Sequence, residues 1–383
     1  MTNPISEFLQ ECIEANDFPS AVYLVAEKGQ IVFQDALGYA VVEPERIPAT
    51  PNTIYDLASL TKPLVTALLA VVLIENGLLR LDERLATHAG KFYIGEKKHI
   101  TILNLLTHTS GFISWLPFYF FIRGKKVSIE QISTIIADML LGHQPNEKVV
   151  YSDLNFLTLQ GLIEHKYRKN IGEIAGTAIF EPLRLNDTHF NPPKELKPRI
   201  AASEKGNEYE KRTCEELGYV EPLAEEGRSD NPPSPFRNEV IWGEVHDGNA
   251  YFMGGVAGHA GLFSTAEEVL KIALQFLPDH TTLLKPDTCE LFRTNFTPGM
   301  NEARSIAFQL AETPESAAGS RMSPQSFGHL GFTGTSLWID PVKERVFILL
   351  TNRTHAHPLP FVNINSVRRR FHDLSNQMLD EKN

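Results

Sequence analysis

Apolar and polar residues follow two different periods near the start of the chain. Over residues 6–14 apolar side chains recur at helical spacing, and the pattern stops at Pro19. Two β-rich runs follow, residues 21–26 and 31–34, on either side of a turn at Gly29. The pattern predicts a short first helix and then a hairpin that begins a sheet.

The other end of the chain repeats this combination of strands and a helix. Residues 335–340 and 346–350 are β-rich runs joined by a turn, and residues 362–379 are amphipathic at helical spacing. Between the two ends, residues 59–190 follow mostly helical periods. This order predicts one α/β domain built from both termini, with an all-α domain inserted between its halves.

The predicted boundaries follow from these changes of period. The α/β domain takes residues 1–57 and 250–383, and the mostly helical domain takes residues 58–249. Within the helical domain, residues 192–240 are rich in Pro, Glu, Lys, Ser and Asn and lose periodicity. We expect a long, partly mobile surface loop there.

The most apolar stretch, residues 63–74, lies between Lys62 and Glu75. It is about three-fifths of the ~20 residues that a membrane-spanning helix needs, so it predicts a buried core helix and no membrane span. The 383 residues are 42% hydrophobic and 22% charged, as in an ordinary globular protein, with a net charge of 36 − 47 = −11. That charge argues against nucleic acids and anionic membranes as partners.

Metal and location are also constrained by composition. The three cysteines lie far apart, and the histidines show no H-E-x-x-H motif and no third ligand at a recognisable spacing, so we expect no metal and no cofactor. The first seven residues have neither a basic segment nor an apolar run, which predicts a cytoplasmic protein. The sequence leaves the oligomeric state open.

The first candidate chemistry is an S-x-x-K motif, Ser59 to Lys62, directly before the apolar helix. On a helix this spacing places both side chains on one face, within hydrogen-bonding reach. A lysine whose pKa is lowered by burial can take the proton of the serine hydroxyl, and the helix N-terminus favours negative charge on a substrate oxygen. The alternative is an N-cap serine beside an exposed lysine.

Two further polar clusters follow along the chain. Tyr151 and Asp153 stand before a helical segment, where the aspartate could be an N-cap and the tyrosine a packed aromatic. A phenol beside a lysine is instead a plausible second proton carrier. The last cluster contains His329 and Gly331, with further glycines at 328 and 334 that permit close approach of a backbone or ligand to a strand edge.

In this order, Ser-x-x-Lys, Tyr-x-Asp and His-x-Gly resemble the S-x-x-K, Y-x-N and K-T-G motifs of the serine β-lactamase and penicillin-binding-protein superfamily. Further stretches are similar to its class C and family VIII carboxylesterase branch: residues 100–111, 180–183, 243–247 and 254–261. The resemblance implies a β-lactamase/transpeptidase-like fold, an antiparallel sheet flanked by helices with an inserted helical domain.

The resemblance also implies a role for each matching residue. Ser59 would be the acylated nucleophile, and Lys62 and Tyr151 would form the pair that moves its proton. The oxyanion hole would be the backbone N–H groups of Ser59 and Phe332. Gly331 would lie among the substrate-binding residues.

Two substrate-binding positions depart from the family pattern. Asp153 stands where β-lactamases carry an asparagine, and it could instead pair with Lys62 and shift the base role to Tyr151. His329 replaces a lysine and is largely neutral at pH 7. Both changes weaken recognition of an anionic, peptide-like substrate. The aromatic residues 115–121 either wall an apolar acyl pocket or pack in the core.

The sequence therefore predicts a serine hydrolase that cleaves small esters, with amides as a further class, through an acyl-enzyme on Ser59. The alternatives within enzymes are a β-lactamase, a D-Ala-D-Ala carboxypeptidase or a D-aminopeptidase. The alternative outside enzymes is a binding or assembly protein on the same fold.

Overall fold

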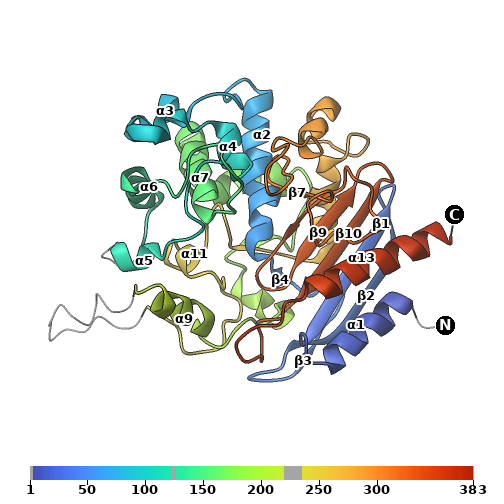
Figure 1. The fold of residues 1–383 in the computed structure, drawn as a ribbon. Helices are drawn as coiled ribbons and strands as arrows, with labels where there is room; N and C mark the ends of the chain where they lie inside the picture. Colours follow the sequence, from blue (N-terminus) through green and yellow to red (C-terminus); the bar gives the residue numbers. More distant parts are fainter. Residues whose placement is uncertain (1–2, 123–125, 220–234, 383) are drawn as a thin grey trace, which may run out of the picture.

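A computed structural model describes residues 3–122, 126–219 and 235–382. Its largest element is an antiparallel sheet of seven strands in the order β3-β2-β1-β10-β9-β8-β7 (Figure 1). The strands are β1 (Ser20–Glu27), β2 (Gln30–Val41), β3 (Ile47–Pro48), β7 (Gln309–Leu310), β8 (Phe327–Leu330), β9 (Ser336–Asp340) and β10 (Arg345–Thr351). Strands from the two ends of the chain meet where β1 pairs with β10, as the two predicted hairpins require.

Each face of the sheet has its own hydrophobic core, because successive side chains of a strand point to opposite faces. Tyr23 and Val25 of β1 pack under the two terminal helices, α1 (Pro4–Glu14) and α13 (Asn365–Asp380), which lie side by side on one face (Figure 1). Val22 and Leu24 point to the other face, where α12 (Ala266–Ala273) packs on β1 and β10. Both predicted terminal helices are therefore confirmed.

The middle of the chain is mostly helical. Its α-helices are α2 (Leu68–Glu75), α3 (Leu85–His88), α4 (Ile102–Leu106), α5 (Phe118–Phe121), α6 (Ile129–Asp138), α7 (Asp153–Tyr167), α8 (Ile171–Ala175), α9 (Glu208–Glu216) and α11 (Gly248–Phe252). Short 3₁₀ or π segments are η1 (Ala58–Leu60), η2 (Lys62–Ala67), η3 (Gly90–Phe92), η4 (Gly95–His99), η5 (Gly176–Phe180), η6 (Lys194–Arg199), η7 (Leu274–Phe276) and η8 (Pro286–Phe292). A small sheet is formed by β4 (Tyr55–Asp56), β6 (Leu262–Ser264) and β5 (His189–Phe190). It joins the helical part of the chain to the segment that precedes Ser59. The exact domain boundaries stay a prediction.

The apolar helix lies in the centre of the molecule. Residues Ala58–Glu75 are long and apolar enough to cross a membrane by length and composition, but 78% of this window is buried inside the protein. The segment begins with the 3₁₀ turn η1, passes through the π-type turn η2 and ends as α2. The burial of this segment is that of the core helix that the sequence predicts.

The prediction of a long surface loop over residues 192–240 is wrong in part. The segments η6 and α9 lie within it, while residues 220–234 lie outside the described part of the chain. The helix α9 has few apolar residues and is anchored by two buried side chains, Glu210 and Cys214. Periodicity missed it because a buried carboxylate holds one of its two anchor positions.

The turn between β8 and β9 is joined by side chain to backbone hydrogen bonds to residues 56–60, the nucleophile segment, which contains Ser59. Thr333 Oγ1 donates to the Asp56 carbonyl at 2.7 Å, and Thr335 Oγ1 donates to the Leu57 carbonyl at 3.0 Å. Gly331 lies in this contact, where a Cβ atom would come within 2.0 Å of Thr335 Oγ1 and 2.6 Å of the Leu57 oxygen. The close approach that the sequence predicts at this glycine is confirmed.

Replacing Gly331 by alanine should therefore separate the two segments. We expect Gly331→Ala to lower the free energy of unfolding by about 1–3 kcal/mol, because an added methyl group has no room without backbone movement. Denaturant unfolding measures the change. The matched control is Gly90→Ala, where a Cβ meets nothing within 4 Å. Equal stability of the two variants would contradict the assigned contact.

Candidate active site

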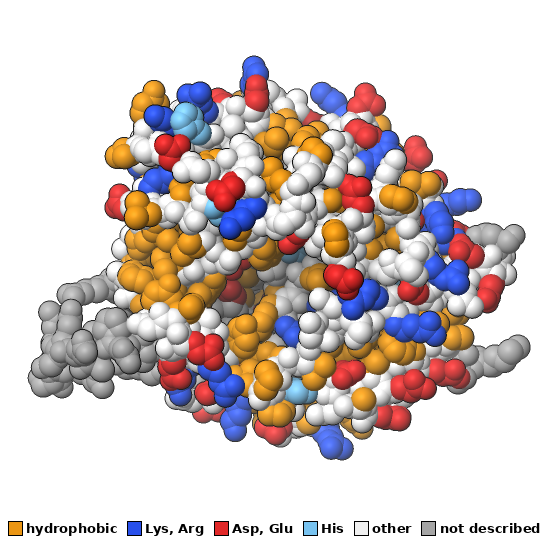
Figure 2. All heavy atoms as spheres, viewed as in Figure 1, with side chains coloured by type: hydrophobic (Ala, Val, Ile, Leu, Met, Phe, Trp, Pro, Cys, Tyr) orange, Lys and Arg blue, Asp and Glu red, His pale blue; other side chains and the backbone are white. Residues whose placement is uncertain are grey.

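The predicted site residues meet at one cleft of about 940 Å³ between the helical part and the sheet. Figure 2 shows a recess near the centre of this face, with hydrophobic side chains gathered beside it over α5 and α11. The predicted residues that line the cleft are Ser59, Tyr151, Asp153, His329, Gly331 and Phe332. Lys62 lies directly beneath, fully buried.

The nucleophile candidate sits on a strained turn. Ala58, the residue before Ser59, has a φ of +48°, which is uncommon for a residue with a side chain. The turn is held by hydrogen bonds at both sides of the Ala58 backbone, because its N–H donates to Asp56 Oδ1 and its carbonyl accepts from Thr61 Oγ1. Strain of this kind is maintained only where the surroundings over-determine it.

Lys62 binds three acceptors at once. Its Nζ donates to Ser59 Oγ at 2.9 Å and to the His259 carbonyl at 3.2 Å, and it pairs with Asp153 Oδ1 at 2.8 Å. An ammonium group has three N–H donors, so this set of partners is that of a charged lysine. The alternative of an exposed lysine beside an N-cap serine is wrong, because Lys62 has no solvent exposure.

The expectation of a lysine with a lowered pKa is also wrong in the resting structure. Burial is the largest single influence and lowers the pKa of Lys62, but the interactions with Asp153 and Tyr151 together outweigh it, so the pKa lies above its ordinary value. The predicted pairing of Asp153 with Lys62 is present. Asp153 is the first residue of α7, where the helix N-terminus also favours its charge.

Tyr151 is buried between rings and cations. Its ring packs against the ring of His108, with centroids 4.6 Å apart. Lys62 Nζ lies 4.9 Å from the centroid of the Tyr151 ring, which is a cation–π contact. Burial raises the pKa of Tyr151 and the charge of Lys62 opposes that rise. Within the described residues its hydroxyl makes no hydrogen bond of good geometry. Lys62 and Ser59 both lie close enough to the phenol to lower its pKa, and its role as a second proton carrier stays a prediction.

The two predicted oxyanion donors are both available. Ser59 is the second residue of η1, where an N–H has no acceptor within its own helix. The Phe332 N–H belongs to the turn between β8 and β9 and makes no hydrogen bond to the described part of the chain. Ser59 and Phe332 line the same cleft, and the oxyanion hole formed by their N–H groups stays a prediction.

His329 is neutral in this environment. Burial, together with the charges of Lys62 and Arg304, holds its pKa well below the ordinary range. Its Nδ1 lies 2.9 Å from the Leu330 carbonyl and must donate, which leaves Nε2 as an acceptor with no partner in the described chain. A neutral acceptor at this position does not attract a carboxylate.

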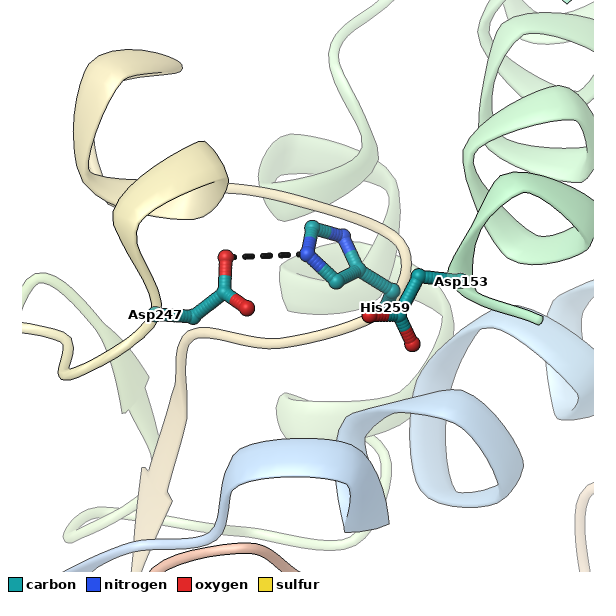
Figure 3. A group of neighbouring side chains, drawn as sticks. All are labelled: Asp153, Asp247 and His259. Carbon is teal, nitrogen blue, oxygen red and sulfur yellow. Dashed lines mark hydrogen bonds and ion pairs between the residues drawn. The ribbon is translucent and has the colours of Figure 1, made fainter. Parts of the chain in front are cut away.

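Asp153, Asp247 and His259 form the one cluster in the described residues whose side chains could hold a metal ion (Figure 3). One ligand atom of each lies within 4.8 Å of the others. Each carboxylate already has a partner, since Lys62 pairs with Asp153 and His259 Nε2 lies 3.0 Å from Asp247 Oδ1. The ammonium beside Asp153 opposes a divalent cation, so we assign the cluster to positioning the His259 carbonyl that binds Lys62.

Several cleft residues carry no sequence motif. They come from α9, from the loops before β7 and after β10, and from α13: Tyr209, Glu210, Arg304, Arg353 and Arg368. Nothing in their local sequence separates them from surface charges, because only the tertiary fold brings them to the cleft. The aromatic stretch divides between its two predicted roles, since Trp115 lines the cleft whereas Phe118 is buried in the core.

Comparisons with known proteins place this geometry in context. A family model described as Beta-lactamase matches residues 5–368. An Escherichia coli K12 protein named "Putative D-alanyl-D-alanine carboxypeptidase" is 30% identical over 378 residues, covering 92% of this chain and 82% of that protein. Among solved structures, the hydrolase EstCE1 superposes with a TM-score of 0.72 at 20% identity, covering 97% of both chains. A class C β-lactamase from Rhodobacter sphaeroides gives 0.70 at 17% identity, covering 99% of this chain and 100% of that one.

The buried carboxyl of Glu210 should make stability depend on pH. It accepts hydrogen bonds from Tyr119 Oη and the Gly248 N–H, and burial, with the nearby charge of Asp247, raises its pKa to about 7 from an ordinary 4.5. The folded state then binds this proton more tightly than the unfolded state, so its stabilising effect is full below pH 4.5 and is lost as pH rises through 7.

Glu210→Gln removes this titration. We expect the variant to gain about 1–3 kcal/mol of stability relative to the wild type between pH 5 and pH 8. Denaturant unfolding at both pH values measures it, with the exposed Glu216→Gln on the same helix as control. A stability difference that does not change with pH would refute the raised pKa.

Proposed function

Because the chain belongs to the beta-lactamase family of serine hydrolases, we propose that it hydrolyses small esters, and amides as a further class, through an acyl-enzyme on Ser59. One observation carries the proposal. Lys62 Nζ lies 2.9 Å from Ser59 Oγ at the floor of a cleft where the Phe332 N–H is unpaired. The proposed nucleophile, proton carriers and oxyanion donors therefore all lie at the same cleft.

Acylation follows from this geometry. Ser59 Oγ attacks the ester carbonyl carbon, its proton passes to the Lys62–Tyr151 pair, and the N–H groups of Ser59 and Phe332 stabilise the oxyanion. The carbonyl reforms, the bond to the alcohol breaks, and the pair returns the proton to the leaving alcohol. In deacylation the pair takes a proton from water, whose oxygen attacks the acyl carbon. Ser59 leaves with that proton restored, so the cycle is balanced.

The resting pair carries one proton too many to act as a base. Both Lys62 and Tyr151 have raised pKa values, so the ammonium and the neutral phenol predominate. One proton must leave the pair before Ser59 can give up its own. Activity should therefore rise with pH as the pair loses this proton.

The ester preference rests on His329 and Asp153. A neutral imidazole and a carboxylate acceptor replace the cation and the amide donor that would hold an anionic peptide-like substrate. The second candidate is a D-Ala-D-Ala carboxypeptidase. It is favoured by the name of the E. coli relative, and by the guanidinium groups of Arg353 and Arg368 at the cleft.

Ser59→Ala tests the nucleophile. We expect it to lower hydrolysis of a short-chain p-nitrophenyl ester by more than ~1,000-fold, because the variant lacks the hydroxyl that would form the acyl-enzyme beside Lys62. The mass shift of the intact protein after a fluorophosphonate probe should disappear in parallel. Ser366→Ala, at an exposed position on α13, is the matched control. Wild-type turnover by Ser59→Ala would overturn the assignment, and a wild type without label or turnover would favour a binding protein.

The substrate class needs a separate comparison. Rates on the ester, a chromogenic cephalosporin and a D-Ala-D-Ala peptide, each with Ser59→Ala as background, distinguish the candidates. We expect the ester to be cleaved fastest. A larger kcat/KM on the peptide would replace the esterase proposal by the carboxypeptidase.

Asp153→Asn tests the source of the raised lysine pKa. Removing the negative charge lowers the pKa of Lys62, so the pair loses its proton at lower pH. We expect the rising limb of the kcat/KM profile to move to lower pH by at least about one pH unit. Asp279→Asn, at an exposed position, should leave the profile unchanged. A limb that stays in place or moves to higher pH would contradict the role given to Asp153.

A further inference from the structure

A buried arginine lies behind the turn that carries the Phe332 N–H. Arg368 of α13 is 5% exposed, and its Nη2 donates to the carbonyls of Gly331 and Thr335, both at 3.1 Å. Its Nη1 donates to Asn365 Oδ1 at 2.9 Å. The two carbonyls stand at either end of the turn, so one guanidinium fixes both of its ends.

One of these carbonyls belongs to the same peptide unit as the proposed oxyanion donor. The Gly331 carbonyl and the Phe332 N–H are the two ends of one planar group. A charged donor on the carbonyl polarises the unit, which makes its N–H a stronger donor, and also fixes its direction. Arg353 holds the next unit in the same way, with Nε donating to the Phe332 carbonyl at 2.8 Å.

The other proposed donor is supported similarly, but by a neutral group. The Ser59 N–H shares its peptide unit with the Ala58 carbonyl, which accepts from Thr61 Oγ1 at 2.7 Å. Both oxyanion donors thus have a hydrogen bond behind their carbonyl. Only the Phe332 unit has a full positive charge there.

The positive charge behind this turn comes from Arg353 and Arg368. Among the described residues neither Arg353 nor Arg368 forms an ion pair with a carboxylate. Burial, together with the charge of Arg353, lowers the pKa of Arg368 to about 9. Two guanidinium groups without ion-pair partners in the wall of the cleft lower the stability of the fold. Neutral side chains could fill the same space without this loss. A negative charge that forms nearby during the reaction would offset this cost.

We propose that Arg368 is a positioning residue for acyl transfer, which orients and polarises the Gly331–Phe332 peptide toward the developing oxyanion. The proposal rests on the proposed function. The full negative charge exists only in the tetrahedral transition state and intermediate, so Arg368 should affect kcat far more than substrate binding.

Arg368→Met tests this with a side chain of similar length and no charge. We expect kcat on the ester to fall about 10- to 100-fold, with KM changed less than ~3-fold. The affinity of a boronic acid, which forms a tetrahedral anion on Ser59, should fall by a similar factor. Arg368→Lys, which keeps the charge but loses the paired geometry, should lie between. The exposed Arg370→Met on the same helix is the control.

A variant that fails to fold would also lose activity. Fluorophosphonate labelling therefore first measures the fraction of each variant that has a reactive Ser59, and the rates are expressed per labelled site. In Arg368→Ala, added guanidinium ion should raise kcat by several-fold and leave Arg370→Met unaffected. Wild-type kcat and boronate affinity in a fully labelled Arg368→Met would overturn the inference. So would equal losses in kcat and 1/KM, which a merely structural role predicts. A wild type that is not labelled would instead mark failure of the proposed function.

Discussion

The buried ammonium of Lys62 is the interaction on which the rest of the site depends. A lysine with no solvent exposure requires acceptors for all three of its protons, and these come from three separate segments of the chain. Ser59 lies one turn before it, Asp153 begins α7, and the His259 carbonyl belongs to the loop before β6. Satisfying one charge thus fixes the positions of the nucleophile and of the helix that follows Tyr151.

A second constraint is the contact between the β8–β9 turn and the nucleophile segment. Two threonine hydroxyls and the absence of a side chain at Gly331 let the β8–β9 turn approach residues 56–57. This contact brings the N–H groups of Ser59 and Phe332 to one cleft. The proposed oxyanion donors are therefore positioned by the backbone, and the side chains of Thr61 and Arg368 hydrogen-bond to the carbonyls of the same peptide units.

The cleft has charged and neutral groups at different places. Asp153 keeps Lys62 charged at rest, whereas His329 stays neutral because burial and two nearby cations disfavour its protonation. The positive charge in the cleft wall lies instead on guanidinium groups behind the oxyanion turn. In the proposed mechanism, a substrate would meet neutral and acceptor groups at Asp153 and His329, with positive charge behind the turn that carries the Phe332 N–H.

Hydrophobic periods in the sequence determined both hairpins, both terminal helices and the buried helix after Ser59, because each of these elements buries one regular face or a continuous run. The three short motifs determined Ser59, Lys62, Tyr151, His329 and Gly331 as site candidates. The hydrophobic pattern did not predict α9, because one of the two buried positions of this helix is a carboxylate, Glu210. Only the tertiary structure decided the protonation of Lys62 and the arrival of Arg353 and Arg368 at the cleft, because a pKa and a long-range contact depend on neighbours distant in the chain.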